Sequence, residues 1–289
     1  MRNKTGLFDI VNIILMLGLI VVTLYPFWYM ISVSLSGELS IMQGKVNFWP
    51  VDFTLGWYKT VFNDPRIGIG YRNTIMYAAV GTAIALMATS MGAFALSQKR
   101  MIFRKGIMLA IVFTILFGGG MIPSFLVVKE LGILNTMWAM VLPGAVGTFN
   151  LLVFRTFFEG LPEELYDSGR IDGLNDIGLF FRIVMPLSKA VYAAIGLFSA
   201  VGIWNNFYSA IIYLRNPDLF PLTMILRDLI IKGTLDAEMA VQSTVGGDLV
   251  TTDALKFATI MATTLPILFL YPFLQKYFVK GVMLGSVKG

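Results

Sequence analysis

The sequence predicts an all-α integral membrane protein with six transmembrane helices. Apolar residues make up 57% of its 289 residues and charged residues only 13%, and the mean hydropathy is +0.76. Soluble domains are less apolar and carry about 25% charged residues. A spanning helix needs about 20 residues, so a chain of this length holds six spans and their loops, without room for a separate soluble domain.

Two side chains that carry much of protein chemistry are missing from the composition. The chain has no cysteine and no histidine, which excludes disulfides, thiolate chemistry and histidine proton relays. We therefore expect no metal site and no catalytic residues. The net charge of +5 is explained by membrane topology, which places basic residues on the cytoplasmic side, and we expect no nucleic-acid partner.

Six apolar runs are the expected spans: 10–35, 73–97, 107–128, 137–158, 187–214 and 255–278. The first is too long for a cleaved signal sequence and is expected to be retained. The second is rich in small residues, which let helices approach closely in lipid. Glycines and prolines interrupt the third and fourth, which is tolerated where a helix is buried in protein or lines a cavity; a simple kink is the alternative.

The charge of the short loops predicts the orientation. Residues 98–106 carry four basic side chains and no acid, as is typical of a loop retained in the cytoplasm. With six spans, both termini are then cytoplasmic. The segments 36–72, 129–136 and 215–253 are expected outside, and the last of these, polar and acidic, is the expected dock for a binding protein.

A charged segment between the fourth and fifth runs, residues 161–190, is expected to lie in water. Its charged side chains include Glu163, Glu164, Asp167, Arg170, Asp172, Asp176 and Arg182. An ionised side chain at the bilayer centre costs about 2.5 to 3.5 kcal/mol. Pro162 and the following acids predict a helix over 163–170, which Gly173 ends.

A second short helix is expected after Gly173. Ile177, Phe180, Phe181 and Val184 recur at helical spacing and give it one apolar face. Two short helices bent at a glycine form a compact unit suited to docking into a groove on another protein. A plain surface loop is the alternative.

This segment resembles the EAA loop of ABC importer permeases, in which an E-A-A triplet, three residues, a glycine and a later hydrophobic-Pro pair recur. Its positions are occupied here by Asp167, Ser168, Gly169, Gly173, Met185 and Pro186. Two further stretches, FGGGMIPSFLVVKELGILNTMWAMVLPG (117–144) and QKYFVKGVMLGSVKG (275–289), are similar to the carbohydrate branch, related to the smaller membrane subunit of the maltose transporter, and to its subgroup for complex oligosaccharides. The chain departs from the pattern at Asp167, Gly169, Leu174 and Ala190.

The resemblance implies the type I ABC importer permease fold and a domain division. Residues 1–72 would form the first transmembrane helix and an outer loop. Residues 73–289 would form a core of five transmembrane helices, with a cytoplasmic coupling loop over 159–186 and a cytoplasmic tail over 279–289.

The function implied is that of a membrane-spanning subunit in a bacterial cytoplasmic membrane importer for an oligosaccharide or polysaccharide fragment. Its expected partners are a second homologous permease subunit, two ATPase subunits, an extracytoplasmic solute-binding protein and the lipid bilayer. ATP and Mg would be bound by the ATPase, and this chain would hold no cofactor.

The resemblance also assigns residues to the ATPase contact. The coupling residues it implies are Glu164, Asp167, Ser168, Gly169, Asp172, Gly173, Phe180, Phe181 and Pro186. Asp167 would make the charged contact, and Phe180, Phe181 and Ile183 would fill the groove on the ATPase. In the tail, Lys280, Gly281 and Lys288 would reach into the ATPase dimer.

The residues themselves favour an external energy source. The expected spans contain no Asp or Glu, whereas carriers driven by ion gradients place ionisable groups in the membrane. Gly118, Gly119 and Gly120 are followed by Met-Ile-Pro and not by the Gly-Lys-Ser/Thr of a phosphate-binding loop. A separate ATPase is therefore expected to drive the chain.

The substrate path is the least specific prediction. Aromatic faces and amides can together bind a sugar, and the candidates are Asn150, Trp204, Asn205, Asn206 and Tyr208. The alternative assigns the aromatic residues to the membrane interface and the asparagines to helix contacts. Two other functions stay open: a permease of the same superfamily for a non-sugar solute, such as amino acids or phosphorus compounds, and an integral membrane enzyme.

Overall fold

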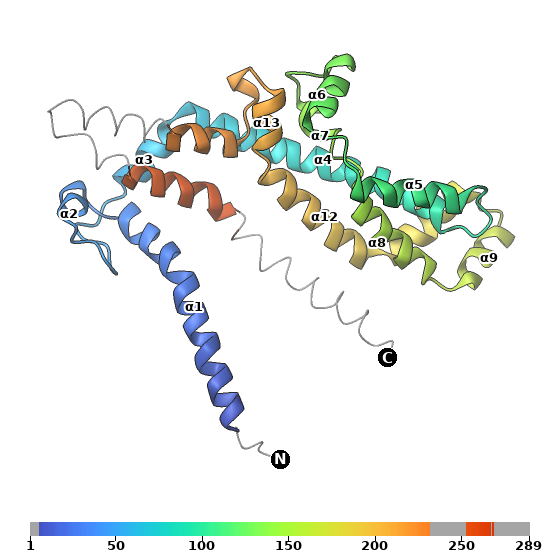
Figure 1. Ribbon diagram of the computed structural model, residues 1–289, viewed down its shortest axis with the longest axis horizontal. Coiled ribbons are helices and arrows are strands. Elements are labelled where there is room, and N and C mark those ends of the chain that lie inside the picture. The colour runs from blue at the N-terminus through green and yellow to red at the C-terminus, as the bar shows by residue number, and fades with distance from the viewer. Residues whose placement is uncertain (1–5, 232–252, 267, 269–289) are drawn as a thin grey trace. The chain divides into compact units, whose positions relative to one another are not determined.

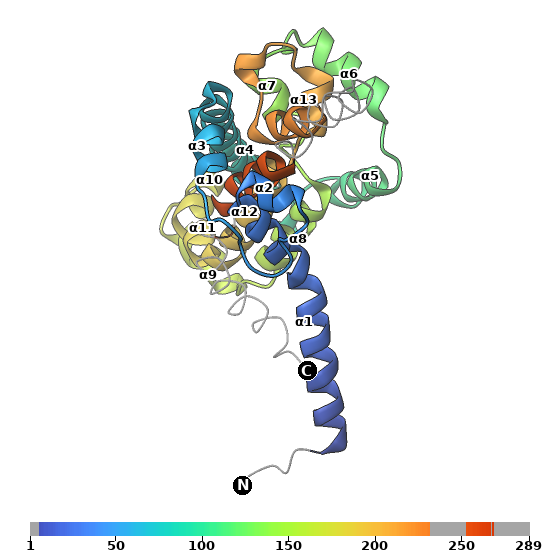
Figure 2. The same ribbon diagram turned by 90° about the vertical axis from the view of Figure 1, so that its left-hand side faces the viewer.

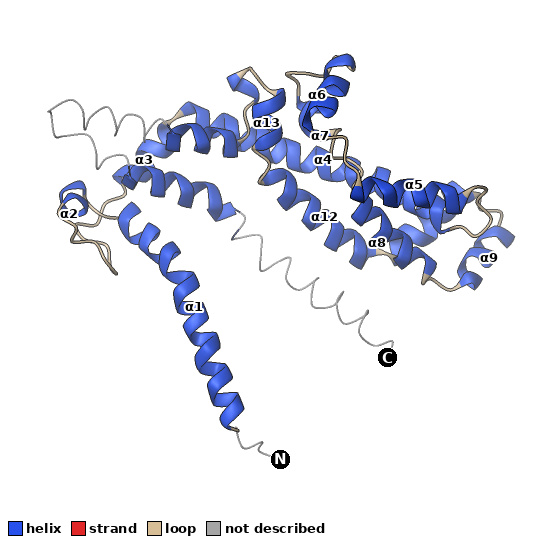
Figure 3. Cartoon of the chain, in the orientation of Figure 1, coloured by secondary structure: helices blue, strands red, loops and turns tan. Residues whose placement is uncertain are grey.

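The computed structural model describes residues 6–231, 253–266 and 268, and in these residues every regular element is a helix (Figure 3). The chain divides into two compact units. Within the described residues, the first unit holds 6–68, 225–231 and 253–266, and the second holds 69–224 and 268. The predicted boundary between residues 72 and 73 stays a prediction.

The first unit begins with α1 (Leu7–Ser34), followed by α2 (Glu38–Met42) and α3 (Gly56–Asn63). Helical segments over 225–231 and 253–266 belong to the same unit. Its core gathers Val33, Val46 and Ala254, with Trp57 packed against them. The segment 36–72, expected to be a loop, thus contains two short helices, and α4 already starts at Pro65.

The second unit contains most of the remaining helices (Figure 1). They are α4 (Pro65–Ser97), α5 (Arg104–Leu116), α6 (Met121–Glu130), α7 (Met137–Val141), α8 (Thr148–Glu159), α9 (Glu163–Ile171), α10 (Asp176–Leu179), the π-helical turn η1 (Phe180–Val184), α11 (Met185–Leu187), α12 (Lys189–Trp204), α13 (Tyr208–Tyr213) and the 3₁₀ turn η2 (Pro217–Leu219). A further helix over residues 222–231 crosses the boundary between the two units after Met224.

Two helices of the described residues, α1 and α4, are long and apolar enough to cross a membrane. Two bent pairs also qualify if each is taken as one span: α5 with α6, bent by 118°, and the segment 176–187 with α12, bent by 84°. The first bend lies inside the span expected over 107–128, where glycines and a proline were expected to interrupt the helix, and the second lies at the start of the span expected over 187–214. Gly120, with a φ of +83°, lies in the first break, where glycine adopts a backbone that other residues avoid. The number of six spans stays a prediction.

The core of the second unit lies where α4, α8 and α12 meet the segment between α8 and α12 (Figures 1 and 2). Phe94 of α4 packs against Phe180, with ring centroids 5.4 Å apart, and Phe154 of α8 packs against Tyr192 of α12 at 4.8 Å. Elsewhere along α4 a small residue permits the close approach of α12, since a Cβ at Gly81 would lie 2.6 Å from Ile203 Cδ1.

The first half of α4 holds the segment around η2. The buried Asn73 amide donates to the carbonyls of Asp218 at 2.7 Å and Phe220 at 3.1 Å. One turn further along, the Tyr77 hydroxyl donates to the Leu219 carbonyl at 2.7 Å. These bonds satisfy backbone groups that would otherwise be buried without partners.

Candidate functional site

The segment between α8 and α12, residues 159–186, is called the elbow here. Its first helix, α9, starts directly after Pro162 and carries acids in its first turn and Arg170 in its last, an arrangement that suits the helix dipole. Gly173 has a φ of +80° and ends the run, as predicted. Asn175 then caps α10, its side-chain oxygen accepting the Gly178 N–H at 2.8 Å.

The elbow has two arms, α9 before Gly173 and the segment from Asp176 to Pro186 after it. The two arms touch at Gly169. A Cβ at this position would lie 2.5 Å from Leu179 Cδ2 and 2.7 Å from Ile183 Cδ1, which is closer than atoms of a real side chain approach one another. Tyr166, three residues earlier in α9, donates its hydroxyl to the Phe158 carbonyl at 3.0 Å. Burial raises the pKa of Tyr166, so its hydroxyl keeps the proton that it donates. The elbow is thus fixed to the end of α8.

The apolar residues of the second arm point in two directions. Phe180 is 2% exposed and lies in the core with Leu179 and Val184, whereas Ile177 is 64% and Phe181 41% exposed. The single apolar face predicted for this arm is therefore wrong. Phe180 and Val184 are four residues apart and share the side that faces the core, whereas Ile177 and Phe181, also four apart, share the side that is exposed.

One correction and one addition follow for the predicted coupling residues. Phe180 is enclosed by its own chain and is not free to fill a partner's groove in this structure. Gly169 is buried where the two arms of the elbow approach closely, and its contribution to coupling stays a prediction. Ile171, which the sequence analysis missed, is 86% exposed. The sequence feature that could have identified it is an apolar residue within a charged stretch, close to Gly173. The other predicted residues are exposed: Glu164, Asp167, Ser168, Asp172, Gly173, Phe181 and Pro186.

Ion pairs join the elbow to the loop that follows α4. Lys99 Nζ lies 2.8 Å from Glu163 Oε2, and Arg100 pairs with Asp176. The hydrogen bond from Lys99 lowers the pKa of Glu163, and the same bond raises the pKa of Lys99. The basic loop 98–106 is thus more than the topological signal read from the sequence, because it also contacts the acidic elbow.

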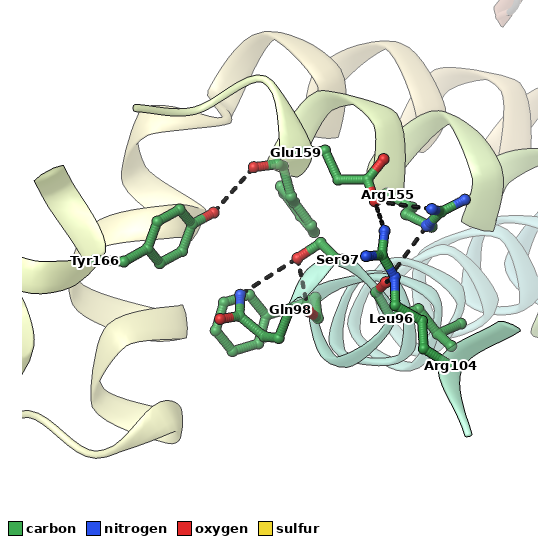
Figure 4. A network of polar contacts seen from close by, with 9 residues as sticks. Leu96, Ser97, Gln98, Arg104, Arg155, Glu159 and Tyr166 are labelled. Atoms are coloured by element: carbon green, nitrogen blue, oxygen red, sulfur yellow. Dashed lines mark hydrogen bonds and ion pairs between the residues drawn. The ribbon is translucent and has the colours of Figure 1, made fainter. Parts of the chain in front are cut away.

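A cluster of arginines holds the end of α4 (Figure 4). Arg104 Nε donates to the Leu96 carbonyl at 2.8 Å, and Arg155 Nε donates to the same carbonyl at 3.3 Å. Both guanidinium groups pair with Glu159 at the end of α8, the Arg155 contact being 2.8 Å. The contact covers a carbonyl left open at a helix end and joins α4, α5 and α8.

A cavity of about 280 Å³ in the second unit is lined by two of the predicted substrate residues, Asn150 and Asn206. Ser199 and Ser209, which the sequence analysis did not select, also line it. The Asn150 side chain makes no hydrogen bond within the described residues. Asn206 accepts the Ser209 N–H at 3.1 Å and donates to its hydroxyl at 2.9 Å, so it also holds the start of α13.

The other three predicted substrate residues do not line this cavity. Trp204 is 9% exposed and buried in its own chain. Asn205 and Tyr208 are exposed, and the Tyr208 hydroxyl contacts Met121 Sδ at 3.0 Å. The structure therefore brings together the amides but not the aromatic faces of the predicted set.

Some predictions fall on parts of the chain outside the described residues. These are the tail residues Lys280, Gly281 and Lys288, most of the predicted last span, and residues 232–252 of the acidic outer segment. Among the residues described, no cluster of three or more acidic side chains is arranged to hold a metal ion.

Comparison with known proteins gives a consistent result. The family model for the "Binding-protein-dependent transport system inner membrane component" matches residues 7–284. Protein LplC of Bacillus subtilis (strain 168) is 42% identical over 289 residues, covering 100% of this chain and 97% of the relative. The polygalacturonan/rhamnogalacturonan transport system permease protein YtcP of the same strain is 39% identical, covering 99% and 100%.

A solved structure shares the fold. It is a chain of a bacterial ABC transporter involved in the import of the acidic polysaccharide alginate, and it superposes with a TM-score of 0.87. The two chains are 31% identical, and the match covers 96% of this chain and 99% of the other.

Proposed function

This chain belongs to the family of binding-protein-dependent transport system inner membrane components, and we propose that it is the membrane-spanning subunit of an importer for an oligosaccharide or a polysaccharide fragment. The family and its relatives are transport permease subunits, so the chain is a membrane protein and not an enzyme. The relative YtcP is named for the transport of polygalacturonan and rhamnogalacturonan, and the solved structure is described as an importer of alginate. Both names support a saccharide cargo.

The proposed assembly follows from the family. A second homologous permease subunit completes the translocation path, two ATPase subunits bind ATP and Mg, and an extracytoplasmic binding protein delivers the saccharide. The chain crosses the membrane six times with both termini in the cytoplasm. The basic charge of the loop 98–106 supports a cytoplasmic position for that loop. Ion pairs join the loop to the elbow, so the elbow lies on the same side of the membrane.

The elbow is the proposed entry point for force from the ATPase. The observation that carries this proposal is the division of its apolar residues. Ile171, Ile177 and Phe181 are exposed, while Phe180 and Leu179 fix the same arm in the core. Exposed apolar side chains on a charged, water-facing segment fit a hydrophobic groove on a partner. Their displacement is passed to α4, α8 and α12, which share that core.

The cavity lined by Asn150 and Asn206 is the proposed part of the substrate path. Its amides and the Ser199 hydroxyl supply donors and acceptors of the kind that sugar hydroxyls need. The Asn150 amide is the better candidate of the two, because the Asn206 side chain already bonds Ser209.

The coupling proposal is tested in the complex reconstituted with its ATPase subunits, partner permease and binding protein. We expect Ile171→Asp to weaken ATPase binding by about 2 kcal/mol, as for a central interface residue, and to abolish substrate-stimulated hydrolysis. Asp167→Lys should have the same effect on stimulation. Leu39→Asp is the matched control, since Leu39 is 71% exposed but lies in the segment proposed to be outside. Full stimulation in both elbow variants would refute the proposal.

The cargo is tested with the extracytoplasmic binding protein of the proposed importer. Calorimetric titration with galacturonate oligomers, neutral oligosaccharides, amino acids and phosphonates separates the saccharide proposal from its alternative, a permease for a non-sugar solute. Saccharide binding with no response to the other solutes is expected. Binding of an amino acid or a phosphonate alone would refute the saccharide cargo while leaving the coupling role intact.

A further inference from the structure

A groove of about 840 Å³ runs from the loop after α4 along the first turns of α5. It is lined by four basic side chains, Lys99, Arg104, Lys105 and Arg155, and by apolar ones that include Met108, Leu109 and Val112. No acidic side chain lines it. We propose that this groove binds an anionic phospholipid of the cytoplasmic leaflet.

The charge balance favours an anion. Of the four cations, Arg104 and Arg155 share the single carboxylate of Glu159, and Lys99 pairs with Glu163. Lys105 makes no ion pair within the described residues. Two acids against four bases leave two positive charges uncompensated, and a phosphodiester headgroup supplies a negative charge to match them. Basic pockets beside transmembrane helices on the cytoplasmic side are known to hold such headgroups.

The order of residues along α5 favours a lipid over a soluble anion. Arg104 and Lys105 lie in the first turn, and Met108, Leu109 and Val112 follow. At 1.5 Å per residue, the distance along the axis from Arg104 to Val112 is about 12 Å. The apolar residues from Met108 to Val112 cover about 6 Å of that length. A molecule that fills the whole groove therefore needs a charged end and an apolar part.

The outer surface of α5 continues the apolar part. Leu109, Phe113 and Leu116 are exposed. Acyl chains lying against these side chains would remove apolar surface from water, which is favourable. An acidic segment of the ATPase could match the charges, but it would leave these apolar side chains uncovered. The phospholipid accounts for both halves of the groove.

The test uses the full chain in detergent, with bound lipids counted by native mass spectrometry. Phosphatidylglycerol and phosphatidylcholine with identical acyl chains are compared. We expect phosphatidylglycerol to be retained more tightly, and Lys105→Gln to weaken this retention about fivefold, the effect of one basic residue at a membrane surface. Lys105→Arg should retain it. Lys189→Gln, the same charge change at the start of α12 and outside the groove, should leave it unchanged.

Two further measurements separate the possible occupants. Soluble glycerol phosphate should not displace the lipid, and displacement at equal concentration would overturn the proposal in favour of a free phosphate site. In the assembled complex, a crosslinker on Lys105→Cys, the single cysteine of the chain, should not reach the ATPase, and efficient crosslinking would assign the groove to that protein. Equal retention of both lipids, or no effect of Lys105→Gln in a variant with unchanged thermal unfolding, would also overturn it.

Discussion

Phe180 and Phe181 are neighbours in the sequence with opposite surroundings, and replacing each by alanine should separate stability from coupling. Phe180 is 2% exposed and packs against Phe94 at 5.4 Å. Removing a buried phenylalanine costs about 3 to 5 kcal/mol, because the lost transfer energy is increased by the cavity left behind. Phe180→Ala should therefore lower the thermal unfolding midpoint of the purified chain strongly.

Phe181→Ala should change stability much less. The side chain is 41% exposed, and full burial of a phenylalanine is worth about 1.5 to 3 kcal/mol, so the loss here is about 1 kcal/mol. If Phe181 docks on the ATPase, this variant instead loses substrate-stimulated ATP hydrolysis in the reconstituted complex.

The assay pairs tryptophan fluorescence during thermal unfolding with ATP hydrolysis measured with and without the loaded binding protein. Comparable midpoints for the two variants would refute the assignment of Phe180 to the core. Normal stimulation in Phe181→Ala would refute its role as a docking residue, even if the difference in stability were found as expected.

Three further predictions concern the elbow. Gly169→Val should cost about 1 to 3 kcal/mol by overpacking, since even a Cβ would lie 2.5 Å from Leu179; an unchanged unfolding midpoint would contradict this close approach. Gly173→Ala should cost about 1 to 2 kcal/mol because φ is +80° there, measured in the same way. The lowered pKa of Glu163 means that its pairing with Lys99 stabilises the fold fully above the ordinary carboxyl pKa and is lost as pH falls through the lower folded value. The small difference in midpoint between wild type and Glu163→Gln should therefore vanish in acid and in high salt, and a difference that grew in acid would contradict the pairing.

Local chemistry made the ends of many elements predictable. Pro162 and two acids placed the start of α9, and Gly173 placed the break after it. Composition and run length located the apolar segments, and the glycines marked the interruption of the third, but the size of the bends was not predicted. The bends of 118° and 84° depend on how the segments pack against each other. The spacing of apolar residues within one segment does not determine the angle between two segments.

Long-range contacts were beyond the sequence for the same reason. Lys99 and Glu163 are 64 positions apart, and only the fold brings them together, although their opposite charges on one expected side of the membrane were a usable signal. The misplacement of Phe180 has a similar cause. The helical spacing showed which apolar residues recur along this segment, but it could not show which of them pack against α4, as Phe180 does against Phe94.

The unbroken length of α4 has a consequence for how the two sides of the membrane communicate. Arg104 and Arg155 both donate to the carbonyl of Leu96 in the last turn of this helix. Asn73, 23 positions before Leu96, donates to the carbonyls of Asp218 and Phe220 next to η2. A helix of that length is a stiff rod of about 35 Å. A small tilt imposed at the arginine end would therefore displace the Asn73 end as well, so in the proposed orientation the outer side of the membrane would respond to the inner side without an intervening hinge.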